Sequence, residues 1–241
     1  MTCNPKNLSD KLVRFRIYKS LIAQEKPFRL KKLGIDEIAL VKGQGNYCAT
    51  LVDLEKSKVV DILPERSQEK MMSVLMSWGT EVLESIEYVS IDLWKPYKSL
   101  VKKLMPNAEV VADRFHVMKQ VNEELDRQRK IQKKEVQKVK LKKKKEEMLS
   151  VLSKSKYALL KNECKLNKKQ KAKLEEVKVG CPSLGKMHEL KEKFRNILEQ
   201  KQDSLTRLLK LSDWLKEAGE YYPESKKTFM RWIGEIIAAL R

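Results

Sequence analysis

The chain has 241 residues, of which 52 are Lys or Arg and 33 are Asp or Glu, so its formal charge is +19. No apolar run approaches the ~20 residues that a membrane-spanning helix needs, and the first residues lack the apolar core of a secretion signal. We therefore predict a cytoplasmic or nucleoid-associated protein with no membrane partner. The charge predicts a polyanionic partner, either nucleic acid or an anionic lipid surface.

The four cysteines, Cys3, Cys48, Cys164 and Cys181, are far apart and form no CxxC pair. This spacing excludes a zinc knuckle or a redox dithiol and predicts reduced thiols that pack in the interior. His188 has no acidic or Cys partner at metal-ligand spacing, so we predict a structural role for it.

Residues 33–117 have the character of an α/β domain. Short β-branched and apolar runs predict strands at 33–40, 47–54, 58–63, 87–91 and 108–112, with a turn at Gly43 and Gly45 between the first two. Helical spacing predicts helices at 67–79 and 95–104. The order is βββαβαβ, preceded by a basic lead-in at 1–32 that includes one expected helix over residues 10–24.

Residues 118–241 are predicted to form a second, all-helical region. The expected helices run from 115 to about 153, from 168 to 178, from 184 to about 211 and from 226 to 240, with a break at 180–183.

A Lys-rich segment lies within the first of these helices. Residues 127–145 hold eleven basic side chains and one acid, which is a net charge of +10. The segment is either a solvated connecting helix or a surface that follows the phosphates of a nucleic acid. The candidate DNA-binding residues are Arg127, Arg129, Lys130, Lys133, Lys134, Lys142, Lys143, Lys144 and Lys145.

Three aspartates mark predicted strands of the α/β region. Asp36 lies inside the first strand, Asp92 closes the fourth and Asp113 closes the fifth. Carboxylates that converge at strand ends are the ligands a hard cation such as Mg²⁺ requires, and two such ions can assist phosphodiester chemistry. The alternative is that each Asp caps the helix that follows. His116, three residues beyond Asp113, either faces the same way as Asp113 or is a packed histidine.

Several motifs of the chain resemble those of one known family. The resemblance is carried by four sequence motifs that occur in the order found in that family: GIDE at 34–37, SIDLW at 90–94, DRFH at 113–116 and LGKMHELKEKFRNIL at 184–198. The chain resembles the DDE transposases of bacterial insertion sequences, of the ISL type designated "L three". The resemblance runs from about Lys32 to the end of the chain.

The resemblance implies a ribonuclease H-like catalytic core at 33–117, followed by the helical insertion region of the family. It implies that Asp36 and Asp92 are the first two acids of a triad that binds Mg²⁺ or Mn²⁺, and that Asp113 and His116 support the site or contact DNA. In the family the third acid is a Glu in a later sequence motif, and this motif is not present in this chain. We do not assign this role to Glu217, Glu220, Glu224 or Glu235.

The expected function is therefore that of an insertion-sequence transposase, which cuts and joins DNA. We expect this copy to be truncated at both ends and catalytically impaired. One alternative is a non-catalytic DNA-binding protein that inhibits or joins a full-length transposase, and a homo-oligomer is a further expected assembly. A second alternative is a cellular ribonuclease H-like nuclease, for which Glu235 would supply the last carboxylate.

Overall fold

The computed structural model describes residues 15–17, 19–20, 22, 26–39, 47–65, 67–200 and 203–240. The chain forms two compact units, residues 1–113 and residues 114–241, and each is described by itself. Residues 15–17 and 19–20 are helical, but most of the helix expected over 10–24 lies outside the described residues, as does the turn at Gly43 and Gly45.

The N-terminal unit is built on a mixed five-stranded sheet of order β3-β2-β1-β4-β5. Its strands are β1 (Lys32–Ala39), β2 (Tyr47–Asp53), β3 (Lys58–Leu63), β4 (Tyr88–Ile91) and β5 (Glu109–Ala112). Strand β2 runs antiparallel to both of its neighbours, β1 and β3, whereas β4 and β5 run parallel to β1. The five predicted strands are confirmed to within one residue at each end, and the sheet establishes an α/β fold.

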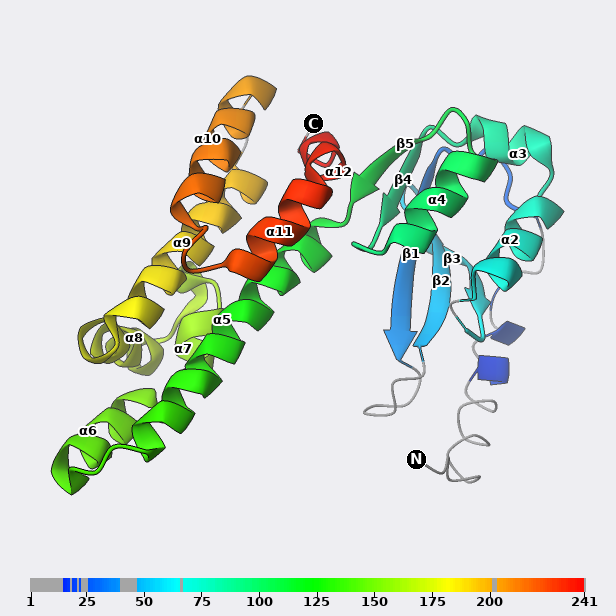
Figure 1. The fold of residues 1–241 in the computed structure, drawn as a ribbon. Helices are drawn as coiled ribbons and strands as arrows, with labels where there is room; N and C mark the ends of the chain where they lie inside the picture. Colours follow the sequence, from blue (N-terminus) through cyan, green and yellow to red (C-terminus); the bar gives the residue numbers. More distant parts are fainter. Residues whose placement is uncertain are drawn as a thin grey trace. The chain divides into compact units, whose positions relative to one another are not determined.

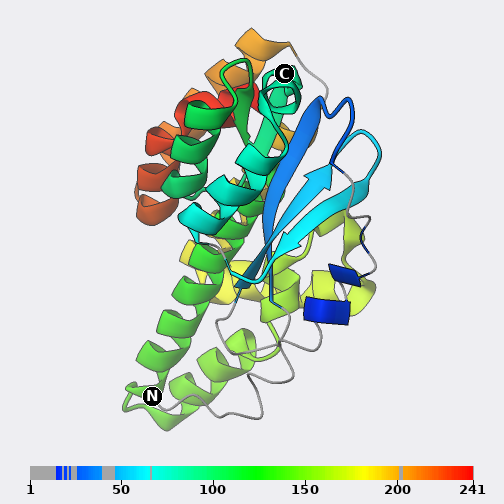
Figure 2. The same cartoon turned by 90° about the vertical axis from the view of Figure 1, so that its right-hand side faces the viewer.

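The interior of this unit comes from the apolar residues of the central strands and two helices. Leu33, Ile35 and Val89 are completely or almost completely buried. Helix α4 (Lys95–Leu104) packs on β4 and β5, and α2 (Gln68–Ser77) packs on α4, on the same side of the sheet (Figure 2). Both helices were predicted. The six-residue helix α3 (Thr80–Ser85) was not, because it is too short to display a helical period.

The C-terminal unit contains only helices in its described residues (Figure 1). They are α5 (Arg114–Gln137), α6 (Lys142–Leu152), α7 (Lys156–Leu160), a 3₁₀ turn at Glu163–Lys165, α8 (Lys168–Gly180), α9 (Pro182–Glu199), α10 (Ser204–Glu217), α11 (Pro223–Arg231) and α12 (Ile233–Ala238). The predicted break at 180–183 is confirmed, since Cys181 ends α8 and Pro182 begins α9.

Three of the predicted long helices are wrong in the same way, because each is divided in two. The helix expected from 115 to 153 ends at Gln137 and resumes at Lys142, so that α6 folds back on α5. The turn lets Val136 and Leu152 become buried, and it separates lysines that would repel one another at i,i+4 in a single helix. The helix expected from 184 to 211 is divided into α9 and α10. The helix expected from 226 to 240 is divided at Trp232 into α11 and α12.

An aromatic cluster stabilises the interior of the C-terminal unit. Phe194 stacks on Phe229 with ring centroids 5.0 Å apart and lies 4.5 Å from Trp214. The polar atoms of the cluster are satisfied: Trp214 Nε1 donates to the carbonyl of Leu190 at 2.7 Å, and the Tyr222 hydroxyl donates to that of Met187 at 2.6 Å. Burial raises the pKa of the Tyr222 hydroxyl, so this donor keeps its proton at any physiological pH.

The prediction of packed thiols is confirmed for two cysteines and wrong for a third. Cys48 and Cys181 are buried free thiols, as predicted, but Cys164 is exposed, so the prediction of a packed thiol is wrong there because the 3₁₀ turn carries Cys164 at the surface. Cys3 lies outside the described residues.

Among the described helices, none has the length and apolar character needed to cross a membrane.

Candidate active site

The three predicted aspartates align across the parallel strands of the sheet. The register pairs Ile35 of β1 with Ile91 of β4, and Ile91 with Ala112 of β5. Asp36, Asp92 and Asp113 each follow one of these three residues. The alignment continues past the strand ends, because the backbone N–H of Asp113 donates to the carbonyl of Ile91 at 2.8 Å. Side chains alternate between the two faces of a sheet, so the aspartates share the face opposite the three apolar residues.

The first two aspartates bring their carboxylates close together. Asp36 and Asp92 each offer an oxygen, and these atoms lie within 4.8 Å of each other. Asp36 is half-buried and Asp92 is 9% exposed. Two carboxylates this close repel each other, a cation between them would offset that repulsion, and carboxylate oxygens are what a hard divalent cation prefers.

Helix capping does not account for Asp92. The residue before helix α4 is Trp94, which has extended backbone geometry, and no side chain caps this helix end. Asp92 contributes its backbone carbonyl, which accepts from the N–H of Trp94 at 2.6 Å. Asp36 lies within β1 and has no helix to cap, so for these two residues the capping alternative is wrong.

The neighbours of Asp36 hold the edge of the site in place. Oδ1 of Asp36 accepts from the N–H of Glu37 at 2.7 Å, and the hydroxyl of Thr50 on β2 donates to the carbonyl of Asp36 at 3.1 Å. The Tyr97 hydroxyl on α4 reaches Glu37 at 3.3 Å, which links this helix to β1. The carboxylate therefore belongs to a hydrogen-bonded strand rather than to a loose loop.

Comparison with known proteins identifies the family to which this site belongs. Residues 33–241 match the family of DDE transposases of the ISL3 type, which is described as transposase. The chain belongs to the ISL3 family of DDE transposases. It is also similar to the transposase for insertion sequence element IS1001 of Bordetella parapertussis, at 26% identity over 170 residues. That match covers 70% of this chain and 40% of the relative's length, and no solved structure matches the chain.

Part of the Lys-rich segment of this ISL3-family chain is paired with a neighbouring acid, Asp126. Arg129 is largely buried and donates to Asp126 at 2.7–2.8 Å, and Lys130 pairs with the same carboxylate at 2.8 Å. Burial raises the pKa of Asp126, but hydrogen bonds from Lys130 and Arg129 outweigh burial and hold that pKa below its ordinary value. Asp126 therefore neutralises part of the predicted basic surface.

The remaining basic residues are mostly in contact with solvent. Arg127 is exposed and lies 3.7 Å from Glu124, and Lys133 and Lys134 are exposed on α5. Lys142, Lys143 and Lys144 are exposed and Lys145 is half-buried, all in the first turn of α6. Positive charges at a helix N-terminus are unfavourable with respect to the helix dipole. An anion bound there is favoured both by the helix dipole and by the lysine side chains.

Two residues of the helical unit that the sequence did not reveal fix its architecture. Glu124 is 1% exposed and accepts from the N–H groups of Glu224 and Ser225 at 3.0 and 2.7 Å, so it caps the start of α11. Arg114, within the DRFH word, donates from Nε to the carbonyl of Ala239 at 2.8 Å and from Nη1 to that of Leu198 at 3.4 Å. Their partners are far away in sequence, so no local pattern predicts either role.

Proposed function

We propose that this chain acts as an insertion-sequence transposase that cleaves and joins DNA with the help of a divalent metal at Asp36 and Asp92. The observation that carries this proposal is the pair of carboxylates, in register on neighbouring parallel strands, with oxygens within 4.8 Å of each other. The relative named as a transposase and the family of the chain support the same reaction class.

We further propose that the N-terminal unit is a ribonuclease H-like core. The sheet order β3-β2-β1-β4-β5, with three antiparallel strands followed by two parallel ones, supports this fold. In such an arrangement the carboxyl ends of the central parallel strands meet at one edge, where substrate commonly binds in open α/β sheets.

Asp36 and Asp92 are the proposed metal ligands, with Mg²⁺ or Mn²⁺ as the ion. The residues fit such an ion because both donors are carboxylates, both are partly shielded from solvent and neither is used as a helix cap. A divalent ion held by these two carboxylates would supply Lewis-acid assistance for phosphodiester cleavage and joining. The chain itself holds the two carboxylates on adjacent strands, so their separation is set by the sheet.

Asp113 and His116 are proposed to support this site. Asp113 follows β5 in register with Asp36 and Asp92, two strands away from Asp36. His116 is three residues farther along, so chain connectivity keeps its Cα within about 11 Å of that of Asp113. An imidazole at that distance can donate a hydrogen bond to a metal-bound carboxylate or to a phosphate.

DNA is the proposed partner, and the exposed lysines of α5 and α6 are its proposed contacts. The four consecutive lysines 142–145 in the first turn of α6 combine side-chain charge with the free N–H groups of a helix start. Contacts of this kind act on phosphates and are independent of sequence. Self-association and nucleoid association are also proposed, because transposition brings two element ends together and DNA is the proposed partner.

The test is metal binding and cleavage by the full chain and matched variants. Titration of Mn²⁺ into the protein is expected to show binding that Asp36→Asn or Asp92→Asn weakens at least tenfold, because each removes one charged ligand. Glu81→Gln, an exposed acid on α3, serves as the control and is expected to change nothing. If both Asp variants bind Mn²⁺ and nick element-end DNA as the unmodified chain does, the site assignment is wrong.

A second candidate is a non-catalytic protein that inhibits a longer transposase of the same family. It is favoured by the small number of acids: within the described residues of the N-terminal unit, no third acid joins Asp36 and Asp92 in a metal-binding cluster. Two carboxylates neutralise a metal pair less well than three, which slows the reaction. We therefore expect DNA binding with slow strand transfer. Adding the chain to an active ISL3-family transposase separates the two roles, since only the second predicts inhibition.

A further inference from the structure

The C-terminal unit contains an open groove that the proposed reaction does not use. Its volume is about 700 Å³, and it lies between α5, α7 and α9. We call it the α5 groove, and its side chains include Phe115, Lys119, Asn122, Lys130, Lys156 and Arg195. The α5 residues recur every three or four positions, so the groove follows one face of that helix for about four turns.

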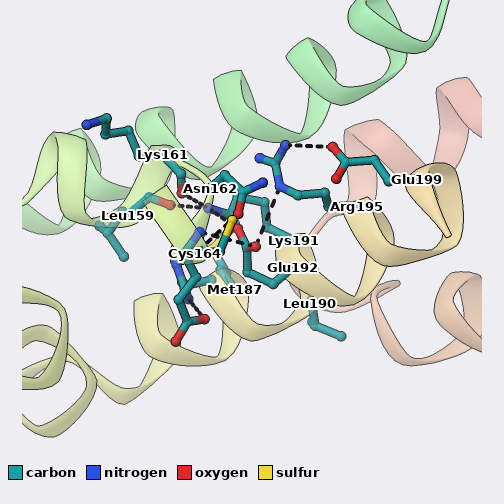
Figure 3. A network of polar contacts seen from close by, with 12 residues as sticks. Leu159, Lys161, Asn162, Cys164, Met187, Leu190, Lys191, Glu192, Arg195 and Glu199 are labelled. Atoms are coloured by element: carbon teal, nitrogen blue, oxygen red, sulfur yellow. Dashed lines mark hydrogen bonds and ion pairs between the residues drawn. The ribbon is translucent and has the colours of Figure 1, made fainter. Parts of the chain in front are cut away.

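The walls of the α5 groove are fixed by buried contacts. Lys191 on α9 is fully buried, and its Nζ donates to the carbonyls of Leu159 and Lys161 at 2.7 and 2.8 Å, which holds the end of α7 against α9 (Figure 3). Arg195 pairs with Glu192 at 3.5 Å and with Glu199 at 3.3 Å (Figure 3). The groove is therefore preformed, with its guanidinium already oriented.

The side chains of the α5 groove combine three kinds of chemistry. Phe115 at one end exposes 69% of its surface. The Oδ1 atom of Asn122 is buried and accepts no hydrogen bond from any group in the described part of the chain. Five basic and two acidic side chains line the groove, and one of those acids, Asp126, is already neutralised by Lys130 and by Arg129 outside the groove. An aromatic ring, an unsatisfied amide and excess positive charge match the base and phosphate of a nucleotide.

The size of the groove suggests what can enter it. The volume is that of a small-ligand site and is too small for a duplex.

We propose that the α5 groove binds one or two unpaired nucleotides, with a base stacked on Phe115 and a base edge bonded to Asn122. This proposal rests on the proposed function, because it takes DNA to be the partner of this chain. It adds a binding site for single-stranded DNA to a surface that would otherwise contact only duplex phosphates.

The test measures binding of a short single-stranded oligonucleotide that contains a fluorescent 2-aminopurine base, without divalent metal. Phe115→Ala is expected to weaken binding at least about fivefold and to reduce the quenching of 2-aminopurine, because stacking on an aromatic ring contributes about 1–3 kcal/mol per base. Phe115→Trp is expected to restore both. Asn122→Ala is expected to weaken binding and retain quenching.

Phe28→Ala is the matched control, because Phe28 is 73% exposed and lies in the other unit. Equal losses for Phe28→Ala and Phe115→Ala would overturn the proposal, as would equal losses on single-stranded and duplex DNA. Because metal is absent, the result does not depend on cleavage: a chain that fails to cleave DNA but binds the oligonucleotide through Phe115 refutes the proposed activity and leaves the groove in place.

Discussion

The buried carboxylate of Glu124 allows a quantitative test of how the helical unit is held together. Its Oε1 accepts from the N–H of Glu224, and its Oε2 accepts from both the N–H and the hydroxyl of Ser225, at 2.6–3.0 Å. The N–H groups of a first helical turn have no partner within their own helix. The variant Glu124→Ala therefore leaves one buried backbone donor, the N–H of Ser225, and one partly buried donor, the N–H of Glu224, without an acceptor.

The expected cost of Glu124→Ala follows from these contacts. A buried donor without a partner costs roughly 1–3 kcal/mol and a partly buried one costs less, so the two together predict a loss of about 2–4 kcal/mol in the free energy of unfolding. Glu124→Gln keeps an oxygen for Ser225 but turns an NH₂ group toward the N–H of Glu224, and we expect a smaller loss of about 1–2 kcal/mol. The alanine variant should thus be the less stable of the two.

Urea unfolding followed by circular dichroism measures this difference, and hydrogen exchange at residues 224 and 225 locates it. Glu123→Ala is the control, because its side chain is exposed on the same helix, and it should change the stability by less than about 0.5 kcal/mol. If Glu124→Ala costs less than about 1 kcal/mol, or no more than Glu123→Ala, the reasoning about buried donors fails. Unchanged protection of the two amides would refute it as well.

Three further predictions concern buried and basic groups. Lys191→Met should lower the free energy of unfolding by about 3 kcal/mol, since it leaves two carbonyls and Glu192 without their donor, whereas Lys193→Met at the surface should cost less than about 1 kcal/mol. Burial first, then the charges of Lys191, Lys178 and Arg195, lower the pKa of His188 from 6.5 to about 3, so its contribution to stability is complete above pH 6.5 and is lost as the pH falls toward 3. Urea unfolding at pH 6.5 and at pH 5 should show that the free energy of unfolding decreases by at most about 1.4 kcal/mol per pH unit in the unmodified chain, and that this decrease is absent in His188→Leu. An equal decrease in both proteins would contradict this. Replacing lysines 142–145 with Gln should reduce the salt slope of DNA binding by about 0.9 for each phosphate that is no longer neutralised, and the same change at lysines 168, 169 and 171 should not; equal slopes would make 142–145 an ordinary solvated surface.

The sheet could be predicted from the sequence almost to the residue, because each strand is a short run of β-branched and apolar residues between turn-forming ones. Asp36 and Asp92 were predicted for a related reason: they interrupt or end apolar strands, where a charge needs a partner. The parallel register of β1 and β4 then determines that the two carboxylates meet.

The helix boundaries and the buried polar contacts could not be predicted in this way. The turn after Gln137 has no Gly or Pro, and it forms because folding back buries Val136 and Leu152. Lys191 was indistinguishable from a surface lysine, since the carbonyls that accept from it lie 30 and 32 residues away. Such contacts depend on tertiary packing, which overrides local propensity.

The contacts of Arg114 have a consequence for how the protein is made. Its guanidinium binds the carbonyl of Ala239, which is 125 residues later in the chain. During synthesis the N-terminal unit has the five described strands of its sheet available once residue 113 has left the ribosome, because domains fold as units as they emerge. The helical unit must wait for Ala239 before Arg114 can make this contact. The groove walls, in contrast, are complete once α9 has emerged, so we expect different parts of the helical unit to mature at different times.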